Sequence, residues 1–499
     1  MNKISLNILK EIKMKRILIF ATGLMLIGLT SAVLAQPDPA HLKQVAQGII
    51  ESLNSGDSEQ RGRFLKKYYA NADSASAIER WQGHLERFSQ DLGKIKIQNI
   101  DVSNPAQLQI LIRTENPRTI SQWQNLEIYM DSERPEKFFS MGLSPGRDPT
   151  VTLPDRPLTT KEIAKYVSDF IDDLVARDVF SGAVSLAKDG KPFFTGAYGK
   201  ANLRWGIDNK LNTKFNLGSM NKMFTGVAIC QLVSQGKLSF DDLIIRYLPD
   251  YANKEVAGKV TVHHLLTHTS GMGSYWVAMS NMDWTALRSV KDYADLAVND
   301  PLEFEPGERF GYSNSGPLVL GLIIEAISGM NYHDYIRKHV TGPAGMINTD
   351  CYNVDDVIPN LAQGYYWNDE TNAYRSNIFE HSARGSAAGG GFSTVEDLQR
   401  FARSLYDGTL LPADMLEIYT TGKVDFGPGD RYAYLISDAI WEGHRTVGHN
   451  GGAPGINADL KIFTDIGFTV TAMSNVDQAA NAITTYAARL ITHKRPVPN

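Results

Sequence analysis

The spacing of hydrophobic residues predicts a small region of helices followed by strands near the start of the chain. Within residues 39–143, apolar positions at 42–53 and at 78–88 keep the period of a helix. Apolar and polar positions then alternate at 108–112 and at 126–130, which is typical of half-buried strands. We therefore expect a small α+β domain in which helices pack on a sheet.

A second, larger α+β domain is predicted from residue 158 onward. Helical spacing at 163–175 leads into an alternating hairpin at 183–198, which turns at Asp189 and Gly190. Long helical and mixed segments fill the middle of this region. Two strands and a helix close it, at 458–463, 468–473 and 477–492.

Proline marks the boundary between the two domains. Residues 144–157 contain several prolines and few apolar residues, which indicates a linker. The predicted organisation is a small α+β domain at 36–143, a linker at 144–157 and a large domain at 158–499. The small domain offers no catalytic constellation, and gating a cleft, binding a partner and simple packing all stay open as its role.

The start of the chain, residues 1–35, is predicted to be a signal peptide. Lys15 and Arg16 precede an uncharged stretch at 17–36, and small residues favour cleavage after Ala35. The alternative is an uncleaved membrane anchor, for which the stretch is barely long enough. We expect an exported protein, periplasmic or extracellular, with no membrane span after cleavage.

Composition excludes several classes of protein. With 43% hydrophobic and 21% charged residues over 499 positions, the chain has ample material for globular cores. Its net charge of −5 gives no basic footprint for nucleic acid. Two cysteines exclude a disulfide scaffold, and Cys230 lies in an apolar run that predicts a buried, unpaired thiol, although pairing with Cys351 is conceivable.

A serine followed three residues later by a lysine is the smallest serine–lysine signal, because the two side chains share one face of a helix. This spacing alone is weakly specific. It occurs three times, as Ser185 with Lys188, Ser219 with Lys222 and Ser234 with Lys237.

Only the Ser219 pair has a context suited to nucleophilic catalysis. Ser185 lies in the predicted hairpin, where positions three apart point to opposite faces, and Ser234 lies where a helix ends. Ser219 instead precedes a nearly all-apolar helix at 223–233. The free N–H groups and the dipole at such a helix start favour developing negative charge, and Lys222 follows one turn later.

A rival nucleophile, Ser144, lies in a G-x-S-x-G pattern between Gly142 and Gly146. That motif needs the backbone N–H of the residue after the serine for its oxyanion hole. Here that residue is Pro145, which has no N–H, and no helix follows. This alternative is therefore disfavoured.

Tyr312 and Asn314 form the one Tyr-x-Asn pattern in a setting suited to a cleft. The pattern occurs four times, but only here does it lie between a loop at 304–310 and an apolar helix at 318–327. Beside a lysine, the phenol of Tyr312 would be favoured as a phenolate, which could take the proton of Ser219.

His449 starts the only His-x-Gly pattern of the chain, with Gly451 and Gly452 behind it and the predicted strand 458–463 beyond. Small residues there would let a substrate lie along the backbone as an extra strand. His449 could supply a hydrogen bond or a positive charge on the far side of the nucleophile.

Taken together, residues 158–492 resemble the serine β-lactamase and penicillin-binding protein superfamily, especially class C enzymes and their esterase and D-aminopeptidase relatives. The three motifs occur in the family's order, and flanking stretches at 262–271 and 388–391 are also similar. The resemblance implies an antiparallel sheet flanked by helices, plus an all-helical subdomain, with the active site between them.

The resemblance also implies a role for each residue. Ser219 would form an acyl-enzyme, and Lys222 and Tyr312 would share the proton transfers, with the identity of the base left open. Asn314 would bind a substrate amide, and backbone N–H groups of Ser219 and Gly452 would form the oxyanion hole. The remaining substrate-binding positions are His449 and Gly451, and neither a metal nor a cofactor is implied.

Two departures from the superfamily bear on the substrate, a small molecule or a peptide. His449, Asn450 and Gly451 replace its Lys-Thr-Gly triplet, and no Ser-Asp-Asn triplet occurs. The resemblance then favours an esterase over a D-amino-acid peptidase or carboxypeptidase, or a β-lactamase. An alternative of another class is a non-catalytic binding or scaffolding protein. The oligomeric state stays open.

Two further features have more than one interpretation. His264 and His268 have the spacing of a helical metal pair, but no glutamate completes an H-E-x-x-H pattern, so a zinc site is disfavoured. Tyr275 and Trp276 either line a substrate cleft or pack within a loop.

Overall fold

The chain divides into two compact units, Met1–Asp148 and Pro149–Asn499. The computed structural model describes residues 38–104, 106–131, 133–146, 148–279, 282–427, 430–477 and 479–497. The predicted signal peptide lies outside these ranges. Among the helices within them, none is both long enough and apolar enough to cross a membrane. The division between the units falls inside the predicted linker 144–157.

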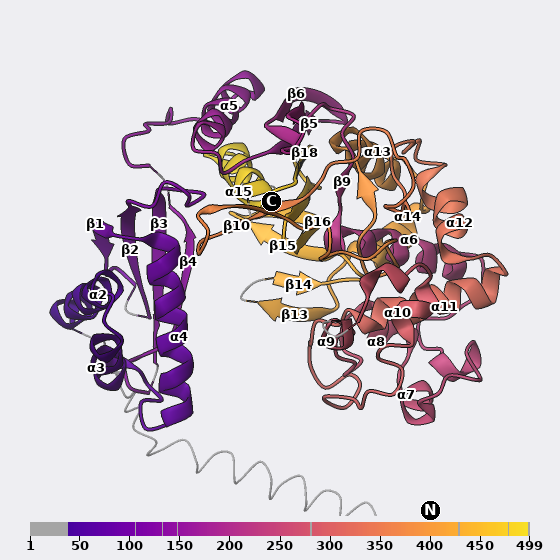
Figure 1. The fold of residues 1–499 in the computed structure, drawn as a ribbon, viewed down its shortest axis with the longest axis horizontal. Coiled ribbons are helices and arrows are strands. Elements are labelled where there is room, and N and C mark those ends of the chain that lie inside the picture. The colour runs from indigo at the N-terminus through magenta and orange to yellow at the C-terminus, as the bar shows by residue number, and fades with distance from the viewer. Residues whose placement is uncertain are drawn as a thin grey trace, which may run out of the picture. The chain divides into compact units, whose positions relative to one another are not determined.

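The first unit is a layer of three helices on a four-stranded meander, as its hydrophobic pattern predicts (Figure 1). The strands pair antiparallel in chain order, and β4 extends into the first residues of the predicted linker. Alternate residues of β2 and β3, such as Leu108 and Ile128, are fully buried against the helices. The elements are α2 (Pro39–Asn54), α3 (Ser58–Tyr68), α4 (Ala75–Leu92), β1 (Ile95–Asp101), β2 (Gln107–Thr114), β3 (Trp123–Met130) and β4 (Phe138–Pro145).

The second unit is built on an eight-stranded antiparallel sheet with the order β13-β14-β15-β16-β17-β18-β5-β6. The predicted hairpin at 183–198 supplies two of these strands, and the predicted closing strands supply two more. The strands are β5 (Gly182–Lys188), β6 (Lys191–Tyr198), β13 (Val424–Gly427), β14 (Asp430–Tyr432), β15 (Ser437–Trp441), β16 (His444–Ala453), β17 (Ile456–Phe463) and β18 (Phe468–Ser474).

Helices cover both faces of this sheet. Nearly every residue of β5, β17 and β18 is buried, which requires cover on each side of the sheet. Helix α15 (Ala479–Thr492) packs on β17, β18 and α5 (Thr160–Ala176), whereas α13 (Val395–Tyr406) packs on β5 and β18.

The middle of the second unit is mostly helical, and Figure 1 shows α8, α10, α11 and α12 grouped beside the sheet. This arrangement confirms the predicted α+β fold with an antiparallel sheet, flanking helices and a helical subdomain. The helices are α6 (Asn221–Ser234), α7 (Lys254–Lys259), α8 (Val262–Leu266), α9 (Trp276–Met279), α10 (Val290–Ala294), α11 (Ser315–Ser328), α12 (Tyr332–Ile336) and α14 (Ala413–Thr420).

Short elements connect these parts. The 3-10 turns are η1 (Gly218–Met220), η2 (Ile244–Arg246) and η3 (Trp284–Ala286), and η4 (Arg337–Thr341) is a π-helical turn. The two-stranded pairs are β7 (Lys200–Asn202) with β8 (Ile207–Asp208), β9 (Phe215–Asn216) with β12 (Phe392–Ser393), and β10 (Tyr365–Asn368) with β11 (Ala373–Ser376).

Candidate active site

Ser219 lies in the turn η1, which leads directly into the buried helix α6. The chain enters this turn through Gly218, whose φ of +50° is a conformation that favours glycine. Helix α6 has no polar face, because it runs through the core of the unit. The buried helix therefore anchors Ser219 from behind.

Lys222 is fully buried, and its side-chain nitrogen contacts three oxygen atoms. Nζ lies 3.1 Å from Ser219 Oγ, 2.9 Å from Asn314 Oδ1 and 2.6 Å from the carbonyl oxygen of Ala388. Burial lowers the pKa of Lys222, since the charged form loses its hydration. Two of the three oxygens only accept hydrogen bonds, so a neutral amine would turn its lone pair to the Ser219 hydroxyl. This is the geometry of a general base.

Tyr312 and Asn314 reach the same place from the loop that leads into α11. Lys222 Nζ lies 5.0 Å from the centre of the Tyr312 ring, which is partly exposed. The side-chain amide of Asn314 donates to Ser274 Oγ at 3.2 Å while its oxygen accepts from Lys222. These two bonds fix the orientation of the Asn314 amide. The structure therefore brings together the four residues of the first two motifs.

Strand β16 packs through glycines against the turn η1, which holds Ser219. A Cβ on Gly451 would lie 1.9 Å from the carbonyl oxygen of Leu217, and one on Gly218 would lie 2.9 Å from the nitrogen of Gly452. Side chains at these positions would push the two segments apart. The close approach sets the backbone of Gly452 beside that of Ser219, as an oxyanion hole made by these two residues requires.

His449 lies on β16 with both ring nitrogens bonded within the protein. Nε2 is 3.0 Å from the Tyr432 hydroxyl, and Nδ1 donates to the carbonyl oxygen of Asn450. Burial, together with the charge of Lys222, lowers the pKa of His449 to about 4. The ring is therefore neutral at neutral pH, in contrast to the positive charge that the sequence allowed.

A pocket of about 60 Å³ opens beside Ser219, Asn314 and Gly452. Aromatic side chains form much of its wall, including Trp276, which is 39% exposed. Among the described residues that line it there is no lysine or arginine. Its lining residues are Asn216, Gly218, Ser219, Tyr275, Trp276, Met279, Trp284, Tyr293, Asn314, Glu380, His381, Ser382, Ala388, Gly389, Gly390, Gly452, Ala453 and Ile456.

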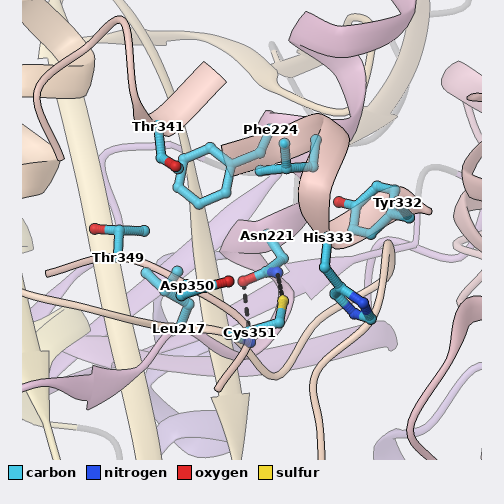
Figure 2. A pocket seen from close by; sticks show the side chains of 11 residues that line it. Leu217, Asn221, Phe224, Tyr332, His333, Thr341, Thr349, Asp350 and Cys351 are labelled. Carbon is cyan, nitrogen blue, oxygen red and sulfur yellow. Dashed lines mark hydrogen bonds between the residues drawn. The ribbon is translucent and has the colours of Figure 1, made fainter. Parts of the chain in front are cut away.

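Sequence reasoning missed Asn221, which joins helix α6 to the glycine-rich segment 388–391. Its amide nitrogen donates to Cys351 Sγ (Figure 2), at a distance of 3.2 Å. Its amide oxygen accepts from the backbone nitrogen of Gly391 at 3.1 Å. The adjoining cavity has only about 10 Å³, room for a single water molecule and no substrate. The signal was the segment 388–391 itself, which sequence analysis noted only as similar to a family.

The other sequence candidates do not belong to the lining of this pocket. Ser144 lies at the end of strand β4, and Ser185 is buried in β5 opposite Thr471. His264 closes a capping box with its own helix α8, whereas His268 lies beyond the end of α8 and binds the backbone nitrogen of Ser313. No group of three or more metal-ligating side chains occurs in the described ranges. Cys230 and Cys351 are both buried and free.

Three comparisons with known proteins show what the second unit of the chain is similar to. A family model described as Beta-lactamase matches residues 167–493. Penicillin-binding protein 4* of Bacillus subtilis is 29% identical over 331 residues, which are 63% of this chain and 72% of that protein. A penicillin binding protein structure from Bacillus halodurans has 28% identity and a TM-score of 0.58, and the match covers 66% of this chain and 98% of that one.

A D-amino acid amidase structure from Ochrobactrum anthropi shares the fold at 22% identity. Its TM-score is 0.57, and the match covers 66% of this chain and 98% of that one. Because the identity is low, this likeness concerns the fold alone.

Proposed function

The chain belongs to the beta-lactamase family of serine hydrolases, and from this premise we propose that it cleaves an ester or amide through an acyl-enzyme on Ser219. The observation that carries the proposal is the 3.1 Å contact between Ser219 Oγ and the buried amine of Lys222. A buried lysine with a lowered pKa, in contact with a serine at the wall of a pocket, is the combination that nucleophilic catalysis needs.

The first half of the reaction forms the acyl-enzyme. Ser219 Oγ attacks the carbonyl carbon of the substrate while its proton passes to Lys222 Nζ. Backbone N–H groups of Ser219 and Gly452 stabilise the oxyanion of the tetrahedral intermediate. As that intermediate collapses, the bond to the leaving group breaks, and the leaving group takes the proton from Lys222, directly or through Tyr312.

The second half releases the acid. A water molecule attacks the acyl ester and gives its proton to the same lysine–tyrosine pair, and Ser219 Oγ leaves as it takes that proton back. The sum is one water consumed, with the carboxylic acid and the protonated leaving group as products. Asn314 is held by Lys222 and Ser274, so it is poised to orient the substrate amide or ester beside Ser219.

The pocket supports a substrate without a carboxylate near the nucleophile. Its described lining has no lysine or arginine, it has the carboxylate of Glu380, and the nearby His449 is neutral. A carboxylate of a β-lactam or of a D-alanyl peptide would find no cation in the lining of this pocket. An ester or amide with an apolar acyl group instead meets the aromatic wall around Trp276.

A second candidate is hydrolysis of an amide or peptide of a D-amino acid. Glu380 favours it, because an amino acid amide carries an ammonium group that a carboxylate in the pocket would attract. One protein with the same fold is the D-amino acid amidase from Ochrobactrum anthropi. The predicted signal peptide supports export, so that substrates outside the cytoplasm would be accessible.

The test is hydrolysis of a short-chain p-nitrophenyl ester by the chain without residues 1–35. Ser219→Ala should lower kcat/KM by about 10³-fold or more. Ser234→Ala, the serine of another serine–lysine pair, is the matched control and should keep full activity. Full activity in Ser219→Ala would exclude Ser219 as the nucleophile.

The same preparation separates the substrate classes. Turnover of D-phenylalanine amide that exceeds ester turnover and falls in Glu380→Gln would favour the amidase. A stable acyl adduct with penicillin, seen as a mass increase that Ser219→Ala lacks, would favour a penicillin-binding activity. Tight ligand binding with no turnover of any substrate would favour the non-catalytic binding protein.

A further inference from the structure

Three buried rings form a hydrogen-bonded chain behind Tyr312. His268 Nε2 lies 3.2 Å from the Tyr432 hydroxyl, which lies 3.0 Å from His449 Nε2. The Tyr312 ring packs on the His268 ring with a centroid distance of 4.5 Å. These rings thus connect Tyr312 with His449 on strand β16.

Backbone groups at both ends of this row of rings fix the direction in which its hydrogen bonds run from donor to acceptor. The N–H of Ser313 can only donate, and it donates to His268 Nδ1 at 3.2 Å. The carbonyl of Asn450 can only accept, and it accepts from His449 Nδ1. With both imidazoles neutral, His268 Nε2–H donates to Tyr432, and the Tyr432 hydroxyl donates to His449 Nε2. Every proton in the chain then meets one acceptor.

A proton added to either histidine breaks this match. On His268 the new N–H would face the N–H of Ser313. On His449 it would turn the Tyr432 hydroxyl away and leave that buried group without an acceptor, which is costly. The hydrogen-bond geometry therefore disfavours charge on both rings, independently of their burial.

We propose that His268 and Tyr432 are positioning residues that hold His449 neutral. In this state the Nδ1–H of His449 donates to the carbonyl oxygen of Asn450. That bond fixes the peptide that leads into Gly451 and Gly452, and thereby the strand that faces Ser219. This part of the inference rests on the proposed function, because the backbone of Gly452 matters for turnover only if it binds the oxyanion.

Three further titratable groups lie around His449, on α6, on the loop before α11 and on β17. Burial lowers the pKa values of both His449 and His268, and the Lys222 amine on α6 lowers them further when it is protonated. Tyr312 lies beside His449 with a ring-centroid distance of 6.5 Å. Asp459 on the neighbouring β17 binds Lys461 and Thr484, and so does not serve as a counter-ion for the ring.

The test is a histidine NMR titration of Tyr432→Phe in the chain without residues 1–35, with isotope-labelled imidazoles. The His449 signals are assigned by their loss in His449→Asn. We expect wild-type His449 to keep its proton on Nδ1 and not to titrate above pH 5. In Tyr432→Phe it should titrate between pH 5 and 7, and kcat/KM for the ester should fall about three- to tenfold.

Two further variants complete the test, the first as a control and the second as another disruption of the same hydrogen-bonded rings. Tyr434→Phe removes another tyrosine–histidine hydrogen bond, of 3.0 Å to His263, and should leave the His449 titration unchanged. His268→Asn keeps an acceptor for Ser313 but loses the donor to Tyr432, and should shift the titration as Tyr432→Phe does. Asparagine also tolerates the φ of +55° at this position.

Three results would overturn the proposal: a wild-type His449 that titrates near 6.5, an unchanged titration in Tyr432→Phe, or the same shift in Tyr434→Phe. The titration is read without turnover. The inference about His449 can therefore be tested separately from the assignment of Ser219 as nucleophile.

Discussion

The side-chain nitrogen of Lys222 donates to the carbonyl oxygen of Ala388 at 2.6 Å. Ala388 belongs to a segment that Asn221 also binds, through the backbone nitrogen of Gly391. Asn221 and Lys222, which are adjacent at the start of α6, are therefore both held by the segment 388–391. The position of the amine relative to Ser219 depends on this loop as much as on the helix.

Lys222→Met should abolish most of the activity while the fold persists. Removing a general base lowers turnover by about 10²- to 10⁴-fold, and methionine fills a similar volume in the core. The control is Lys237→Met, the exposed lysine of another serine–lysine pair. Burst and steady-state kinetics with a p-nitrophenyl ester measure the loss. An active Lys222→Met would assign the proton transfer to another group.

The same amine predicts the pH dependence of the wild-type enzyme. Burial lowers the pKa of Lys222, and the base must be deprotonated to act. The kcat/KM value should therefore rise with pH through an apparent pKa below the usual lysine value of about 10.4. A rise centred at that ordinary value would contradict a buried, deprotonated lysine as base.

Gly451→Ala should strongly lower the activity of the enzyme by separating β16 from the turn η1, which holds Ser219. The added Cβ would lie 1.9 Å from the carbonyl oxygen of Leu217, so the backbone must shift. We expect kcat to fall about 10²-fold, as when one oxyanion donor is lost. Gly427→Ala on the same sheet meets nothing within 4 Å and should keep wild-type kinetics. Equal activity in both variants would refute this close packing.

The aromatic wall of the pocket should determine the preference for the acyl group. Trp276→Ala should raise KM for a phenylacetyl ester about tenfold and change KM for the acetyl ester little, since lost apolar contact acts on the larger group. Trp205→Ala removes a tryptophan that is 74% exposed and lies outside this lining. If both variants raise KM alike, Trp276 does not contact the acyl group.

Asp477 should make stability depend on pH. Burial, with a smaller contribution from the charge of Glu380, raises its pKa from 3.8 to about 6 in the folded protein. Its contribution to stability is therefore present below about pH 4 and is lost as pH rises through about 6.

Asp477→Asn removes this effect and keeps an acceptor for the backbone nitrogen of Gly455. Its free energy of unfolding should exceed the wild-type value at pH 7.5 by about 1 kcal/mol, a figure reduced for partial exposure, and match it at pH 4. Urea unfolding at the two pH values measures the difference. The surface variant Asp250→Asn should show none, and a destabilised Asp477→Asn at pH 7.5 would contradict the raised pKa.

Hydrophobic periodicity sufficed to predict four adjacent strands of the sheet of the second unit, β17, β18, β5 and β6, and the flanking helices α5 and α15. The hairpin at Asp189 and Gly190 and the closing strands are local patterns, which follow from alternation and a turn. Ser219 and Lys222 could also be predicted to meet, because three residues separate them on one helical path.

Contacts between distant segments could not be derived in this way. The bonds from Lys222 to Ala388 and from His268 to Tyr432 join residues that only the tertiary fold brings together. His449 shows the difference most clearly, since its charge depends on its burial and on Tyr432, which the fold brings to its Nε2. A residue pattern identifies which chemical group is present. The surroundings of that group in the fold determine its protonation state.

Strand β5 lies between β6 and β18, so the first and last strands of the second unit are neighbours in one sheet. During synthesis the ribosome releases β5 and the Ser219 turn long before β18 exists. The sheet can close only when nearly all of the chain has emerged, and pairing over such sequence distances is slow. A nascent chain that already contains Ser219 and Lys222 is therefore still inactive, and the enzyme acquires its activity at the end of its biogenesis.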